Sequence, residues 1–105
     1  MNTLHNNVNS KKKVTITATD SIGRTESVKL ILPTKTAARL KIASTNTYPD
    51  GQPYSLLKSE LSNMCDDCAM GYFKELSRSQ FYRLRDFSNL IYHKFYNYTL
   101  SIDIE

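Results

Sequence analysis

The segments KVTITATD (residues 13–20) and RTESVKLILP (residues 24–33) decide the fold. In both, apolar residues alternate with polar ones, which is the period-two pattern of a strand with one buried face. These apolar residues are Val14, Ile16, Ala18, Val28, Leu30 and Leu32. The segment SIG (residues 21–23) supplies a tight connection, and Pro33 ends the second run. The sequence therefore predicts a β-hairpin over residues 12–32.

The segment YTLSIDIE (residues 98–105) alternates in the same way, with Leu100, Ile102 and Ile104 on one face. Its natural neighbour is the hairpin, which gives a small three-stranded antiparallel sheet packed against two or three helices. We therefore expect an α+β fold in the order β-β-α-α-α-β. A chain of 105 residues suits one domain, so we expect a flexible tail over residues 1–10 and a single domain over residues 11–105.

Residues 35–45 are compatible with either a helix or a strand. Ala38 and Ile42 repeat at helical spacing, but together with Leu40 they also alternate. The alanines and straight-chain residues favour a short helix. The following segment NTYPDGQPY (residues 46–54) contains strong helix and strand breakers, which predict a loop.

A helical pattern begins near Ser55, which is a suitable N-cap. Its apolar residues recur at steps of three and four: Leu57, Leu61, Met64, Cys68 and Tyr72. Gly71 weakens this helix near its end but need not stop it. Ser77 and Gln80 then have the spacing of a capping box, so a further helix is expected over residues 77–97 after a short break.

The helix over residues 77–97 has two different sides. One is an apolar stripe that we expect to face the core: Phe81, Leu84, Phe87, Ile91 and Phe95. The other side is polar and aromatic and is available for binding: Arg78, Tyr82, Arg85, Asn89, His93 and Tyr96.

Positive charge is concentrated in two blocks of the chain. Residues 1–45 carry eight Lys or Arg against two acidic residues (+6), and residues 77–97 carry four against one (+3). Such blocks favour an anionic partner, DNA or RNA before a membrane. Further basic residues between 11 and 41 are candidates for phosphate contacts: Arg24, Lys29, Arg39 and Lys41. The main candidate binding residues are Arg78, Gln80, Tyr82, Arg85, Asn89, Tyr96, Lys11, Lys12 and Lys13.

The segment MGYFKELSRSQFYRLR (residues 70–85) partly fits a helix-turn-helix. Met70 and Gly71 would then belong to the first helix, and Arg78 and Gln80 would reach base edges from the start of the second. The turn of this motif usually contains a glycine, whereas here it is Lys74-Glu75.

Catalysis is not expected from this sequence. Cys65 and Cys68 form a single CDDC pair inside a helical pattern, with too few further ligands for zinc, and we interpret them as buried reduced thiols. The chain also lacks a glycine-rich phosphate loop and a supported Cys–His or Ser–His arrangement. We expect no enzyme activity, metal or cofactor, no membrane partner, and a cytoplasmic location.

Protein binding is the alternative function. Tyrosine and arginine are enriched at interface hot spots, so the same side of helix 77–97 suits a protein partner, and the hairpin edge suits strand addition or a homodimer. The chain would then be an adaptor, a subunit or an inhibitor, a class that includes proteins carried by mobile elements.

Overall fold

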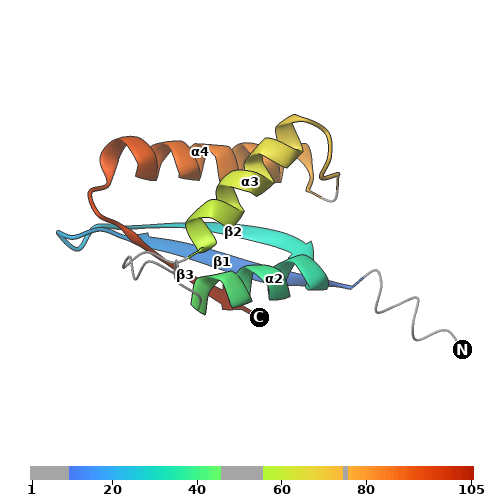
Figure 1. Ribbon diagram of the computed structural model, residues 1–105, viewed down its shortest axis with the longest axis horizontal. Coiled ribbons are helices and arrows are strands. Elements are labelled where there is room, and N and C mark those ends of the chain that lie inside the picture. The colour runs from blue at the N-terminus through green and yellow to red at the C-terminus, as the bar shows by residue number, and fades with distance from the viewer. Residues whose placement is uncertain (1–9, 46–55, 75) are drawn as a thin grey trace, which may run out of the picture.

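The computed structural model describes residues 10–45, 56–74 and 76–105 and has an α+β fold, as predicted (Figure 1). The elements follow in the order β1 (Lys11–Thr19), β2 (Thr25–Pro33), α2 (Thr34–Thr45), α3 (Leu57–Ala69), α4 (Arg78–Lys94) and β3 (Thr99–Ile104). The predicted tail, apart from Ser10, and the predicted loop at residues 46–54 lie outside the described residues. Among the described helices, none is long and apolar enough to cross a membrane.

The three strands form one antiparallel sheet in the order β2-β1-β3. Ile16 in the central strand pairs with Val28 of β2 on one side and with Ile102 of β3 on the other. Directly paired residues point to the same face of a sheet, so the alternating apolar residues of all three strands form one continuous face. The prediction of a hairpin completed by a later strand is confirmed.

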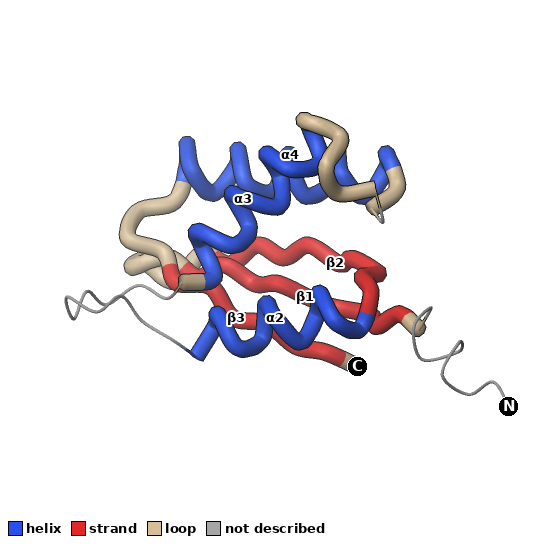
Figure 2. The backbone as a smooth tube through the Cα atoms, turned by 45° about the vertical axis from the view of Figure 1, so that its right-hand side comes forward, coloured by secondary structure: helices blue, strands red, loops and turns tan. Residues whose placement is uncertain are grey.

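The three described helices pack on this apolar face. Figure 2 shows α4 alongside β2 and α2 in front of β1 and β3, with α3 crossing between the two helices. Leu40 of α2, Leu57 of α3 and Leu84 of α4 are fully buried in the same cluster as the sheet residues. Burying one leucine side chain contributes about 1.5–3 kcal/mol, so this shared core fixes the helices on the sheet.

Residues 34–45 form a helix, which resolves the ambiguity of this segment. The buried residues are Ala37, Leu40 and Ala43, which recur every three residues and therefore lie along one side of the helix. The residues whose spacing favoured a helix in the sequence, Ala38 and Ile42, are instead exposed. The alanines allow α2 to lie close to the sheet, and Lys41 Nζ donates a 3.3 Å hydrogen bond to the Ile102 carbonyl of β3.

The hairpin turn is organised by Asp20, which is only 5% exposed. Its carboxylate accepts hydrogen bonds from the N–H groups of Ile22 (3.1 Å) and Arg24 (2.8 Å) and from Arg24 Nε (2.6 Å). Burial alone would raise the pKa of Asp20, but these hydrogen bonds and the charge of Arg24 hold that pKa below its usual value. Arg24 also donates to the Lys94 carbonyl and lies 5.1 Å from the Phe95 ring centre, which joins the turn to the end of α4.

Helix α3 ends at Ala69 because of Gly71. Gly71 has a φ of +80°, and its N–H donates to the Cys68 carbonyl at 3.2 Å. The Tyr72 N–H donates to the Asp67 carbonyl at 2.8 Å, which completes a Schellman motif. The helical spacing that includes Tyr72 in the sequence therefore does not extend the helix beyond Ala69. At its start, Leu56 occupies the N-cap position without a side-chain cap, and Ser55 lies outside the described residues.

Helix α4 begins as predicted but ends earlier. Ser77 is the N-cap, and its hydroxyl accepts a 3.3 Å hydrogen bond from the Gln80 N–H. The helix ends at Lys94, and Phe95 and Tyr96 follow it rather than continuing it to residue 97. A turn after the helix allows the chain to enter β3, with Asn97 in a left-handed conformation at a φ of +48°. The buried stripe consists of Leu84, Phe87 and Ile91.

Candidate functional site

A hollow of about 330 Å³ brings together cations from both basic blocks. Lys13 of β1, Lys29 of β2 and Arg83 of α4 line it, together with Ile31 and Glu105. Residues of odd number in β1 and β2 point to the face of the sheet away from the helices, so Lys13 and Lys29 share that face. Helix α4 lies alongside β2 and adds Arg83 from its flank. We call this the basic hollow.

The three cations of the basic hollow differ from the paired arginines elsewhere. Arg24 is paired with Asp20, Arg39 with Glu60 at 3.5 Å and Arg85 with Asp86 at 3.5 Å. Across residues 10–45, 56–74 and 76–105, by contrast, no ion pair involves Lys13, Lys29 or Arg83, which are all exposed. Among the described residues that line the hollow, Glu105 is the one acid, and its side chain offsets one of the three charges. The hollow is therefore a site of net positive charge.

Hydroxyl groups extend from the basic hollow along the open face of the sheet. Among the described elements, none packs on this face. In register across the three strands, its members are Thr15, Thr17, Thr19, Thr25, Ser27, Thr99 and Ser101, with Asp103 beside Thr15. The Thr17 and Ser27 hydroxyls are hydrogen-bonded at 2.9 Å. Hydroxyl and lysine groups make phosphate contacts in nucleic-acid complexes, but the described strand residues of this face include no aromatic ring for base stacking.

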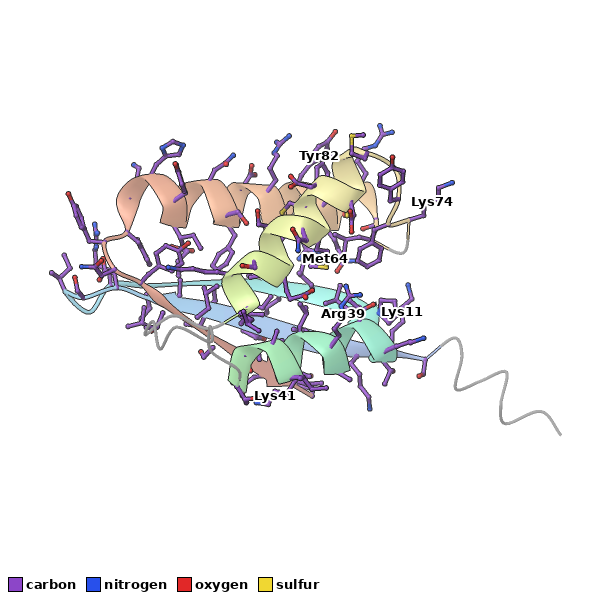
Figure 3. All side chains as sticks on the ribbon, viewed as in Figure 1. Lys11, Arg39, Lys41, Met64, Lys74 and Tyr82 are labelled. Atoms are coloured by element: carbon purple, nitrogen blue, oxygen red, sulfur yellow. The ribbon has the colours of Figure 1, made fainter. Side chains whose placement is uncertain are left out.

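The three consecutive lysines that were predicted as binding residues do not lie on the same face of the sheet. Because successive strand residues point to opposite faces, Lys11 and Lys13 lie on the open face and Lys12 on the helix-covered face. Lys13 alone among them lines the basic hollow. Figure 3 shows Lys11 toward the same end of the molecule as Arg39 and Lys74.

Gln80 has a structural contact that the sequence did not suggest. Its Oε1 accepts a hydrogen bond from the Ile31 N–H on the outer edge of β2. The side chain therefore does not complete the predicted capping box by reaching back to Ser77, although the serine half of the box is present. Gln80 covers one edge N–H of β2 with its Oε1, while Arg78 is exposed in the first turn of α4.

The helix-turn-helix interpretation is wrong. The connection between α3 and α4 covers residues 70–77, which is longer than the turn of about 3–4 residues in that motif. Met70 and Gly71 lie in this connection and not on the first helix. Gln80, expected at the reading end of the second helix, contacts β2 instead.

A second hollow of about 400 Å³ lies between α3 and α4 and reaches β3 at Leu100. We call it the interhelix groove. Arg85, Asn89 and Tyr92 line it from one face of α4, at intervals of four and three residues. The Arg85 guanidinium lies 4.8 Å from the ring centre of Tyr82, a cation–π contact. Predicted residues Arg85 and Asn89 are thus brought together, on the other flank of α4 from Arg83.

A second cation–π pair lies in the interhelix groove. Lys58 Nζ of α3 is 3.9 Å from the ring centre of Tyr98, the residue before β3. Burial lowers the pKa of Lys58 and raises that of Tyr98, because removal from water disfavours the charged form of each group. The groove therefore contains two cations placed against aromatic rings.

Comparisons of the chain with known protein families, curated proteins and solved structures found no match. The function must be inferred from the chemistry of the side chains.

The cysteines favour an inert role. Cys65 and Cys68 are free thiols and are partly, not fully, buried. Burial raises the pKa of the Cys65 thiol, the Ser88 hydroxyl at 3.9 Å lowers it in part, and the neighbouring Asp66 raises it further. The thiolate is thus disfavoured at neutral pH. Within the described part of the chain, no group of three His, Cys, Asp or Glu residues could hold a metal ion.

The helical pattern in the sequence predicted the positions of Tyr96 and Arg83 incompletely. Tyr96 lies beyond α4, where its side chain is 75% exposed and its carbonyl accepts a 3.2 Å hydrogen bond from the Ser21 N–H. Arg83, which joins the basic hollow, was not among the predicted binding residues. The sequence feature that could have pointed to Arg83 is its spacing from Gln80. Arg83 follows Gln80 by three residues, which places both on the same face of α4.

Proposed function

We propose that this protein is a small, non-enzymatic nucleic-acid-binding protein that engages the phosphate backbone at the basic hollow. The observation that carries this proposal is the convergence of Lys13, Lys29 and Arg83, which are exposed and take part in no ion pair within the described ranges. Phosphate contacts of this kind position a nucleic acid without reading its sequence. A regulatory role in the cytoplasm accords with this chemistry and remains part of the proposal.

Charge and surface chemistry support the proposal together. The chain has a net charge of +4, and the hydroxyls of the open sheet face offer further donors beside the hollow. Among the described residues, the hollow is lined mainly by cations, with the Thr15 hydroxyl beside them, a set that suits the binding of an anion.

The test is fluorescence anisotropy with labelled duplex DNA, single-stranded DNA and single-stranded RNA, from about 50 to about 300 mM salt. We expect the logarithm of the binding constant to fall linearly with the logarithm of salt concentration. Each lost phosphate contact should reduce the slope by about 0.9 on duplex DNA and about 0.7 on a single strand. The double variant Lys29→Gln/Arg83→Gln should therefore weaken binding and flatten the slope.

A control variant separates the basic hollow from net charge. Lys35→Gln/Arg39→Gln removes the same number of charges from α2, where Arg39 is already paired with Glu60. Affinity and slope should stay near those of the unmodified chain. Absence of binding at about 50 mM salt, or equal losses in the two double variants, would overturn the proposal.

A protein partner is the second candidate function. Met70 and Tyr72 flank Gly71 with exposures of 66% and 76%, and large exposed apolar side chains of this kind suit an interface hot spot. Gln80 already contacts the β2 edge at Ile31, so a strand added there would have to displace it. A homodimer is the simplest partner, and sedimentation of the chain and of Met70→Ser/Tyr72→Ser over a range of concentrations tests it directly.

A further inference from the structure

The interhelix groove is lined by both apolar and polar groups, and a purely apolar ligand would leave the polar ones unused. Its lining is apolar at Leu61, Ile91 and Leu100. Its polar lining groups are those of Lys58, Asp66, Arg85, Asn89 and two serine hydroxyls. Its volume of about 400 Å³ lies within the roughly 300–1,000 Å³ of small-molecule sites. A ligand that uses all of these groups is flat, polar at its edge and suited to stacking.

Three side chains in successive turns of α4 define how such a ligand would lie. Arg85 and Tyr92 are seven residues apart, about 10 Å along the helix axis, and Asn89 lies between them. The Tyr92 ring is 78% exposed and meets His93 edge to face at 5.1 Å, while Arg85 rests against Tyr82. Aromatic rings and guanidinium planes stack on nucleic-acid bases, and an asparagine amide forms hydrogen bonds with the edge of a base.

We propose that the interhelix groove receives an unpaired base of a single-stranded nucleic acid, stacked on Tyr92 and bonded at its edge by Asn89. This inference rests on the proposed function and makes it specific, because the basic hollow by itself does not distinguish a single strand from a duplex. The base of a duplex is stacked and paired, so it reaches such a groove only after unstacking.

The two sites lie on different sides of α4, so a strand that occupies both has to cross this helix. Arg83 lies on one flank of α4 and Arg85 on the other, and a helix with its side chains is about 10–12 Å across. A strand that crosses α4 can thus place a phosphate at Arg83 of the basic hollow and a base in the groove. Single-strand sites of about 4–16 nucleotides cover that span.

The test compares a labelled single strand of about ten nucleotides with an abasic strand of the same length and phosphate number. Both should show the same salt slope, because the phosphates are unchanged. The strand with bases should bind about five- to 160-fold more tightly, which is the range for losing one stacked base. Tyr92→Ala should remove most of this difference, and Tyr92→Phe should retain it, because stacking uses the ring and not the hydroxyl.

The outcomes separate this inference from the proposed function. Equal affinity for the two strands, or a base-dependent gain that survives Tyr92→Ala, overturns the groove inference while leaving the basic hollow intact. If neither strand binds, the proposed function fails, and the groove is then tested by titrating AMP, GMP, CMP and UMP into the ¹⁵N-labelled chain. Shifts at the Asn89 and Tyr92 amides that Tyr92→Ala abolishes support the base site, and their absence overturns it.

Discussion

Replacing Gly71 by alanine should destabilise the protein through the backbone alone. Gly71 has a φ of +80°, and a Cβ placed there would meet no atom of the rest of the fold within 4 Å, so the cost comes from the local backbone conformation. A non-glycine residue in this left-handed region costs about 1–2 kcal/mol. Alanine also reduces the freedom of the unfolded chain, which returns about 0.4–1 kcal/mol. The net loss in the free energy of unfolding should be about 1 kcal/mol.

This loss is measurable by thermal and urea unfolding. A change of about 1 kcal/mol lowers Tm by about 4–8 °C in a domain of this size, with little change in the urea m-value. Gly71→Asn is the matched control, because asparagine tolerates the left-handed conformation and should lose less. If Gly71→Ala proves as stable as the unmodified chain, or less affected than Gly71→Asn, then the positive φ does not end α3.

Two further predictions follow from the pKa shifts. The pKa of Asp20 is lowered on folding, so its contribution to stability is complete above the usual aspartate value of about 3.9 and is lost as pH falls through the lower folded value. The urea midpoint should therefore fall less between pH 7 and pH 2 in Asp20→Asn than in the unmodified chain. Equal falls in the two proteins would contradict this reasoning. The pKa of Cys65 is raised, so in a Cys68→Ser variant its alkylation by iodoacetamide should be slow at pH 7 and accelerate at alkaline pH, whereas fast alkylation at pH 7 would show an activated thiolate.

Local patterns in the sequence predict the elements of this fold well. The alternation in residues 13–33 and 98–105 identifies all three strands, since each is buried on one face only. Ser77 is correctly identified as the N-cap of α4, because that hydrogen bond closes within four residues. The end of α3 is not predicted, because a single glycine within a helical pattern can either continue the helix or end it. Which of the two occurs depends on the φ of that glycine.

The candidate site is harder to predict because it depends on how α4 lies on the sheet. A helical pattern separates the buried residues of α4 from the exposed ones, but it does not show which exposed flank meets β2. Gln80 and Arg83 lie on that flank, whereas Arg85 lies on the opposite one in the interhelix groove. The sequence therefore predicts two basic blocks but not that Lys13 and Arg83 meet.

The placement of β3 beside β1 has a consequence for folding. Thr19 pairs with Thr99, eighty residues later, whereas β1 and β2 are joined by a tight turn. Closing so long a loop costs more chain entropy than closing a hairpin, and folding slows as contacts become less local. Until β3 docks, the central strand has an unpaired edge that can join a strand from another chain. We therefore expect the slow, aggregation-sensitive step of folding to be the docking of β3, after the hairpin has formed.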